Sequence, residues 1–240
     1  MLFDAAKAVS RRLGNRTLLY SFLTKHIPRD RDVTFIQIGA GDGLVHDPYR
    51  EFILRDNLRG VLVEPLPFQF TRLRRNYSRK RNVVFLNCAV SYPPGTIQLF
   101  TLDEKFLGQN RGRDLLLLQA ATSRERLLES LSIVGLRNAE KYVVELLVPG
   151  RTIEDIMAKE NYSSFDCLFL DLEGYEPHVL LNLDYSVSKP KLIAYEHIYL
   201  GQSAERIQLR LEEMGFRLIK FSQDTVAVAG EWLAPSTQRR

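Results

Sequence analysis

The sequence predicts an α/β fold in which a mostly parallel β-sheet carries helices on both faces. Two observations predict it: short, β-rich apolar runs recur along the chain, and amphipathic segments lie between most of them. Strands that alternate with helices form a parallel sheet, because each helix crosses over the sheet between two strands. With 240 residues, of which 45% are hydrophobic, the chain can bury one sizeable core. We therefore expect a single domain over residues 1–240.

The expected strands follow one another along the chain as VTFIQI, GVLVEP, NVVFLN, DCLFLD and KLIAYE. Near the C-terminus, FRLIKFS and DTVAVAG are only a turn apart around Gln223 and Asp224, a spacing typical of a β-hairpin. A hairpin reverses the chain direction. The sequence thus predicts a seven-stranded sheet with one antiparallel strand.

Two segments depart from this alternation. The first, MLFDAAKAVSRRL, has apolar residues at helical spacing, and we expect residues 1–32 to form a helical cap that docks on the domain or touches a membrane surface. The second, residues 103–142, is a polar, glycine-containing stretch followed by leucines at helical spacing. We expect a helical insert there. It is either a lid over the site, as long inserted segments often are, or a plain excursion over the sheet edge.

Composition and charge limit the functions that the chain can have. The formal charge is +4, but acids and bases are interleaved, which does not favour nucleic acid as a partner. Cys88 and Cys167 lie far apart in apolar segments and match no disulfide or zinc spacing, so we expect a reducing, cytoplasmic location. No run approaches the roughly 18 apolar residues of a membrane span, and none is expected.

A glycine-rich loop, Gly39-Ala40-Gly41-Asp42-Gly43, follows the first expected strand. Glycines at such a turn bring bare backbone N–H groups against a ligand, because no Cβ blocks the approach. A dinucleotide fingerprint would need glycine in place of Leu44, and a Walker-type loop would need a lysine that is absent. The loop therefore disfavours NAD and excludes ATP bound through a P-loop.

Glu64 ends the next expected strand, about 20 residues after the glycines, where an acid can accept hydrogen bonds from both hydroxyls of a ribose. Strand, glycine loop, second strand and acid in this order predict a ligand that contains a nucleoside.

Further acids follow two later strands that should end at the same sheet edge. Asp171 and Glu173 share a face if their strand continues, and we favour a role in the site for them, whereas Glu176 is explained by its place at a helix start. The imidazole of His197 titrates near pH ~6.5 and is either a general base or a structural group. We predict Asp171, Glu196 and His197 as the catalytic group and, alternatively, as ligands of Mg²⁺ or Mn²⁺, which suit carboxylates better than Zn²⁺ does.

Several ordered motifs together resemble the FkbM-type methyltransferases, a branch of the class I S-adenosylmethionine-dependent enzymes: FIQIGAGDG, GVLVEPLPFQFTRLRRNY, LNCAVS, DLEGYEPHVLLNLD and KPKLIAYEH. The resemblance runs from about Val33 to Ala227 and leaves out the first helices and the insert. It implies a Rossmann-like class I methyltransferase fold, S-adenosylmethionine as the cofactor, and O-methylation of a hydroxyl on a sugar or other small metabolite.

Position by position, the resemblance implies a cofactor site. The glycine loop would bind the methionine and ribose part, Glu64 the ribose hydroxyls, and the end of the third strand the adenine. Gln37 stands where many relatives carry Asp, and its amide oxygen would bind the ammonium group. The implied cofactor-binding residues are Gln37, Gly39, Ala40, Gly41, Gly43, Glu64, Asn87, Cys88, Ala89 and Asp171.

The acceptor and the assembly stay open. The basic segment RLRRNYSRKRN, residues 72–82, is either a solvated helix face or a surface for RNA, so an RNA or protein methyltransferase is the first alternative. A catalytically silent cofactor-binding module is the second. Arg111, Arg113 and Arg124 in the insert either hold an anionic acceptor or form a solvated face. The chain is also compatible with a homo-oligomer.

Overall fold

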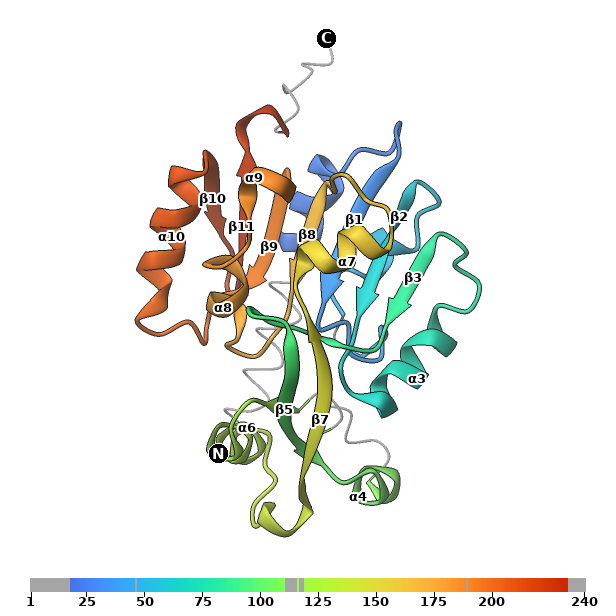
Figure 1. Ribbon diagram of the computed structural model, residues 1–240, viewed down its shortest axis with the longest axis vertical. Coiled ribbons are helices and arrows are strands. Elements are labelled where there is room, and N and C mark those ends of the chain that lie inside the picture. Colours follow the sequence, from blue (N-terminus) through green and yellow to red (C-terminus); the bar gives the residue numbers. More distant parts are fainter. Residues whose placement is uncertain (1–17, 46, 111–115, 117–118, 189, 233–240) are drawn as a thin grey trace.

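The computed structural model describes residues 18–45, 47–110, 116, 119–188 and 190–232, and its upper body is a seven-stranded sheet (Figure 1). The strands lie in the order β10-β11-β9-β8-β1-β2-β3. Their bounds are β1 (Val33–Ile38), β2 (Leu58–Val63), β3 (Val83–Leu86), β8 (Cys167–Leu170), β9 (Leu192–Glu196), β10 (Phe216–Lys220) and β11 (Asp224–Ala229). Only β11 is antiparallel to its neighbours, β9 and β10. The predicted α/β fold and its seven strands are confirmed.

The strands are apolar because both faces of this sheet are covered. Every residue of β8 and β9 is buried, as expected for central strands with helices on either side. Successive side chains of β1 point to opposite faces, so Ile36 and Ile38 enter one hydrophobic core while Val33 and Phe35 enter the other.

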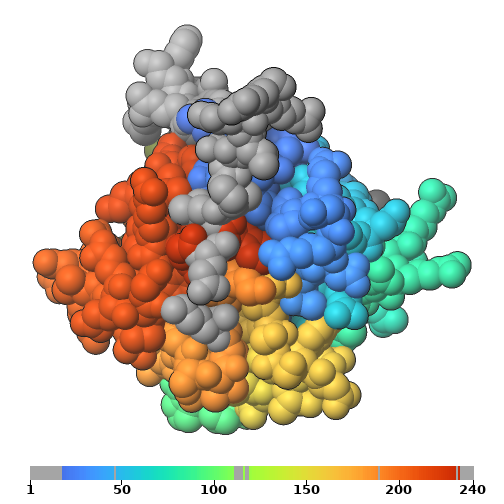
Figure 2. All heavy atoms as spheres, turned by 90° about the horizontal axis from the view of Figure 1, so that it is seen from above, coloured from blue at the N-terminus to red at the C-terminus, as the bar shows by residue number. Residues whose placement is uncertain are grey.

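Helices divide between these two cores. One face is covered by α7 (Ile153–Lys159), α8 (Glu176–Leu180), α9 (Tyr185–Ser188) and α10 (Ser203–Glu213). The other is covered by a helical segment over residues 18–26, α2 (Arg50–Ile53), α3 (Pro67–Asn76) and η2 (Gly230–Trp232). Figure 2 shows the first described residues beside the C-terminal strands, where the rings of Phe22 and Phe221 lie 5.5 Å apart.

The expected N-terminal cap is described only from residue 18 onward. Leu19, Leu23 and Ile27 are buried against the sheet, so this part of the cap docks on the domain. Residues 1–17, on which the expected amphipathic pattern lies, are outside the described residues. In the part of the chain that the structure describes, no helix is both long and apolar enough to cross a membrane.

A second sheet, which the sequence did not predict, forms the lower body in Figure 1. Its strands lie in the order β4-β7-β5-β6. The bounds are β4 (Ala89–Val90), β5 (Gly95–Leu102), β6 (Ala120–Ala121) and β7 (Val143–Arg151). β5 and β7 pair in antiparallel register from Gly95 opposite Gly150 to Leu102 opposite Val143. The segment expected as a helical insert therefore lies at the far end of a long hairpin.

The insert is only partly helical among its described residues. It contains α4 (Glu104–Gln109), α6 (Arg124–Ile133) and the short η1 (Glu140–Tyr142), with strand β6 between the two α-helices. Asp103 and Ser123 cap α4 and α6 through side-chain oxygens that accept backbone N–H groups. A small hydrophobic core of its own, which includes Leu107, Leu127 and Leu131, holds the insert together.

Candidate functional site

A cavity of about 290 Å³ opens where the carboxyl ends of β1, β2 and β8 face the second sheet. This volume is just below the usual range for small-molecule sites, about 300–1,000 Å³. The end of β1 contributes Gln37 to Gly41, the end of β2 contributes Glu64 to Leu66, and the end of β8 contributes Asp171 to Tyr175. The opposite wall comes from the second sheet and the insert: Ala89, Val90, Ile97, Leu99, Ala120, Ala121, Thr122 and Arg126.

The glycine loop has the conformation that its glycines allow. Gly39, Gly41 and Gly43 have φ angles of 77°, 55° and 66°, in the left-handed region that favours glycine. A Cβ on Gly39 would lie 2.0 Å from the Asp171 carbonyl oxygen, so β1 and β8 can approach only because it is absent. A Cβ on Gly43 would collide with the Tyr77 ring. Gly39 and Gly41 line the cavity, whereas Gly43 packs the loop against α3.

Helix α3 braces the loop through Asp42. This carboxylate is 1% exposed, accepts the N–H groups of Leu44 and Val45 at 3.0 and 2.8 Å, and forms an ion pair with Arg72 at 2.9 Å. Asn76 donates to the Asp42 carbonyl at 2.8 Å. The basic segment 72–82 is therefore not simply a solvated face, because its first arginine fixes the glycine loop.

Glu64 lies at the cavity wall with its carboxylate fixed by backbone donors. The side chain is 4% exposed, and its two oxygens accept the N–H groups of Gly41 and Leu66 at 2.8 and 2.9 Å. Burial raises the pKa of Glu64 to about 7. Each carboxylate oxygen keeps a second lone pair, so both can accept a further hydrogen bond from a ligand.

Gln37 presents an acceptor to the same cavity. Its residue is 2% exposed, and its Nε2 donates to Asp47 Oδ1 at 3.2 Å. Asp47 is held in turn by Tyr49 and Tyr77, which donate at 2.9 and 3.2 Å. The carboxylate therefore fixes which way the amide faces. Among the described residues, nothing donates to the buried Oε1 of Gln37. A buried acceptor of this kind is rare in folded proteins and fits a donor group of a ligand.

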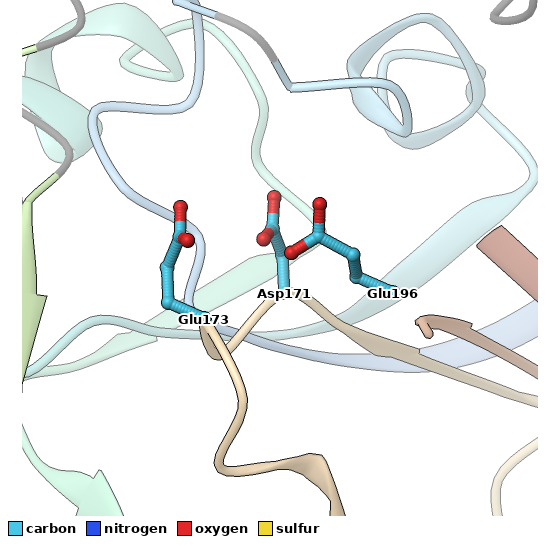
Figure 3. Close-up of side chains that lie close together, drawn as sticks. All are labelled: Asp171, Glu173 and Glu196. Carbon is cyan, nitrogen blue, oxygen red and sulfur yellow. The ribbon is translucent and has the colours of Figure 1, made fainter. Parts of the chain in front are cut away.

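Three acids converge next to the cavity. The side chains of Asp171, Glu173 and Glu196 point to the same side in Figure 3, and one carboxylate oxygen of each lies within 4.8 Å of the others. Asp171 and Glu173 line the cavity, and Glu196 is buried beside them. Glu173 has a φ of 52°, unusual for a residue with a side chain, and such conformations cluster at functional sites.

The turn that carries Asp171 and Glu173 is supported by Glu176. Its carboxylate is fully buried and accepts the N–H groups of Leu172 and Gly174 at 2.7 and 2.9 Å. Burial raises the pKa of Glu176 to about 7. Glu176 is thus the support of the turn, a more specific role than that of an acid at a helix start.

His197 does not join the acids. Its Nδ1 lies 3.0 Å from the Thr225 hydroxyl on β11, and the side chain is not among those lining the cavity. It follows Glu196 directly, and successive residues at a strand end point to opposite sides. Glu173 stands with Asp171 and Glu196 where the sequence predicted His197, so the predicted group of three is not brought together. A catalytic role for His197 stays a prediction.

The end of β3 contributes less to the cavity than expected. Ala89 lines it, but Cys88 is buried in the core. The Asn87 amide donates to the carbonyls of Glu64 and Pro65 at 2.8 and 2.9 Å and so supports the end of β2.

The insert supplies a cavity residue that the sequence did not single out. Arg126 lines the cavity, and its guanidinium carbon lies 4.5 Å above the ring of Tyr199. Arg124, predicted to hold an acceptor, donates instead to the Glu140 carbonyl at 2.7 Å within the insert. The other two predicted arginines, Arg111 and Arg113, lie outside the described residues.

Comparisons with known proteins concern the same part of the chain. The sequence profile of the methyltransferase FkbM domain matches residues 37–218. Among solved structures, the chain is similar to methyltransferase FkbM from Methylobacillus flagellatus KT, with 14% identity and a TM-score of 0.48 over 82% of this chain and 43% of that chain.

Two further structures are similar over most of the chain. One is a precorrin-6y C5,15-methyltransferase from Geobacter metallireducens GS-15, with 14% identity and a TM-score of 0.46 over 89% of this chain and 87% of that one. The other is fibrillarin from Aeropyrum pernix, solved with S-adenosylmethionine, with 13% identity and a TM-score of 0.42 over 88% of this chain and 74% of that one. No curated protein matches the chain.

Proposed function

The chain belongs to the FkbM methyltransferase family, and from this premise we propose that it uses S-adenosylmethionine to methylate a hydroxyl on a sugar or other small metabolite. The observation that supports S-adenosylmethionine as the cofactor is a pair of hydrogen-bond acceptors on either side of the glycine loop. Gln37 Oε1 is a buried acceptor without a donor among the described residues, and Glu64 offers two fixed carboxylate oxygens. The ammonium group and the ribose of S-adenosylmethionine supply donors for both.

The chemistry of the proposed reaction is a displacement at carbon. S-adenosylmethionine, when bound, supplies a methyl group on a sulfonium sulfur; the acceptor oxygen forms a bond to this carbon while the carbon–sulfur bond breaks. The protein has to align the acceptor with the methyl group and accept the hydroxyl proton. Asp171 and Glu173 line the cavity at the end of β8, and we assign proton removal to this pair.

A divalent cation is part of the proposal. Asp171, Glu173 and Glu196 offer three carboxylates whose oxygens lie within 4.8 Å of one another, a donor set that suits Mg²⁺ or Mn²⁺. A bound cation would lower the pKa of an acceptor hydroxyl and orient it. In this assignment Glu173 takes the place that the sequence gave to His197.

One observation favours the alternative of an RNA acceptor. A surface hollow beside α3 is lined by Arg74, Arg75 and Lys80, with aromatic side chains between them. Cations and aromatic rings together suit a nucleic acid. The hollow is separate from the cavity, and Arg74 and Arg75 end a helix, where cations are favourable without any ligand.

The test is a titration of the purified protein with S-adenosylmethionine and S-adenosylhomocysteine, with and without Mg²⁺. We expect binding by the natural protein, loss of binding in Glu64→Ala, and unchanged binding in Glu51→Ala, an exposed acid of α2. If neither compound binds under any condition, the proposal is wrong. If the cofactor binds and RNA binds as well, with an affinity that falls steeply with salt, the RNA alternative replaces the small acceptor.

A further inference from the structure

Among the described residues that line the cavity there is one cation, Arg126 of α6. The guanidinium carbon lies 4.5 Å above the ring of Tyr199, which follows β9. A Cβ on Gly174 would lie 3.8 Å from Arg126 Nη2, so the guanidinium reaches from the insert to the turn that follows Asp171. Arg126 therefore faces the place where the proposed reaction brings acceptor and methyl group together.

The charge of Arg126 is available to a ligand. Its ion pair among the described residues is with Glu129 at 3.6 Å, on the same helix, and Glu129 is 68% exposed. An exposed pair of this length contributes little and is screened by solvent. The Arg126 side chain is only 34% exposed, and its guanidinium lies over the Tyr199 ring, which limits its movement. Its in-plane N–H groups can then donate in parallel to two oxygens of one anionic group.

The other charges of the cavity orient such a ligand. Asp171 and Glu173 line the same cavity as Arg126, and the proposed reaction brings the acceptor hydroxyl to them. An acceptor with a hydroxyl at one position and an anionic group at another is therefore held in one direction, with the anion at Arg126 and the hydroxyl at the acids.

From this geometry we infer that the acceptor carries a carboxylate or phosphate group, which Arg126 binds while the hydroxyl faces Asp171 and Glu173. The inference rests on the proposed function and narrows it from hydroxylated metabolites in general to anionic ones. A uronic acid and a sugar phosphate present the same anionic oxygens to Arg126, and the experiment separates them.

The experiment titrates the protein, saturated with S-adenosylhomocysteine, with D-glucose, D-glucuronate and D-glucose 6-phosphate. We expect at least one anionic sugar to bind about tenfold more tightly than glucose, because a hydrogen-bonded charge adds this much or more. Arg126→Ala should remove the preference, and Arg126→Lys should keep part of it, because lysine has the charge without the planar fork. Arg124→Ala, on the same helix but bonded within the insert, should keep it in full.

The outcomes separate this inference from the proposed function. S-adenosylhomocysteine should bind equally well to the natural protein and to Arg126→Ala, and its failure to bind the natural protein would refute the proposed function. If S-adenosylhomocysteine binds but neither anionic sugar binds more tightly than glucose, the assignment to Arg126 is overturned. It is also overturned if the preference for an anionic sugar survives in an Arg126→Ala variant whose unfolding temperature equals that of the natural protein.

Discussion

At the scale of single residues, Glu64 makes cofactor binding dependent on pH. Burial raises its pKa to about 7, and the charged form is the one that can accept hydrogen bonds from both ribose hydroxyls. Below this pKa the carboxylate is protonated, so affinity should increase as the pH rises through about 7. About one tenth of the groups are charged one pH unit below the pKa, so S-adenosylhomocysteine should bind roughly tenfold more weakly at pH 6 than at pH 8.

Titration calorimetry at the two pH values checks this prediction, with Glu64→Gln as the comparison. Glutamine cannot titrate, so the variant should bind more weakly at pH 8 and lose most of the difference between the two conditions. The amino group of S-adenosylhomocysteine titrates in the same way with both proteins, so it does not cause a difference between them. An unchanged pH dependence in the variant would show that another group is responsible.

The acids at the carboxyl ends of β8 and β9 lead to a separate prediction about metal binding. Mn²⁺ should bind to the natural protein, and Asp171→Asn and Glu173→Gln should each weaken binding by about tenfold or more, because each removes a charged oxygen ligand. His197→Gln should leave the affinity unchanged, since its imidazole lies against Thr225. Titrations that follow the electron spin resonance signal of free Mn²⁺ measure the Mn²⁺ affinity of all four proteins. If His197→Gln weakened Mn²⁺ binding equally, the result would support the predicted ligands, which include His197.

The difference between the predicted group of three residues and the cluster of acids in the structure has a local cause. Asp171, Glu196 and His197 all follow apolar strands, and the sequence correctly suggests that these strands end at one edge. It does not specify the backbone angles of the residues beyond the strand ends. The positive φ of Glu173 turns its carboxylate toward Asp171, and the residue next to Glu196 turns away.

At the scale of elements, Gly39 determines how closely β1 and β8 approach. In Gly39→Ala the new Cβ would meet the Asp171 carbonyl oxygen at 2.0 Å, so the two strand ends must separate. Gly135 is the matched control, because its φ of 85° is close to the 77° of Gly39 and a Cβ there meets nothing within 4 Å. We expect Gly135→Ala to lower the free energy of unfolding by about 1 kcal/mol, the cost of the left-handed conformation alone.

Gly39→Ala should cost at least about 3 kcal/mol and should also abolish binding of S-adenosylhomocysteine, since overpacking adds to the conformational cost. Urea unfolding of both variants gives the free energies, and titration gives the affinity. Equal destabilisation by the two substitutions would mean that the contact between the strand ends relaxes freely and that the first glycine is needed only for its φ angle.

The strands of the two sheets differ in how well the sequence predicts them. β8 and β9 are buried along their whole length, and their continuous apolar runs are recognisable. β5 and β7 both contain exposed positions, including Gln98, Glu145 and Pro149, and the two strands pair across the whole insert. A pairing partner so distant in sequence leaves no local signal, which explains why the second sheet and its cavity wall were not predicted.

At the scale of the whole molecule, the residues that the structure describes form two bodies, and each body contributes a different part of the proposed site. The main sheet carries the glycine loop, Glu64 and the acids, and its two cores contain no residue of the insert. The residues of the insert form another core, against which Phe68 of α3 also packs. Under the proposed function the upper body binds the cofactor and the lower body covers the acceptor side, and a lid over residues 103–142 stays a prediction.

A shortened protein tests this division. Leu102 and Val143 are paired partners at the end of β5 and β7, so a two-residue Asn-Gly turn can replace residues 103–142 and keep the hairpin register. The shortened protein should unfold cooperatively and bind S-adenosylhomocysteine within a few-fold of the natural affinity, because Gln37, the glycine loop and Glu64 are retained. It should lose methyl transfer and anionic-sugar binding, because Arg126 and the wall at Ala120 and Ala121 are removed. If it unfolds cooperatively but no longer binds the cofactor product, the insert is part of the cofactor site itself.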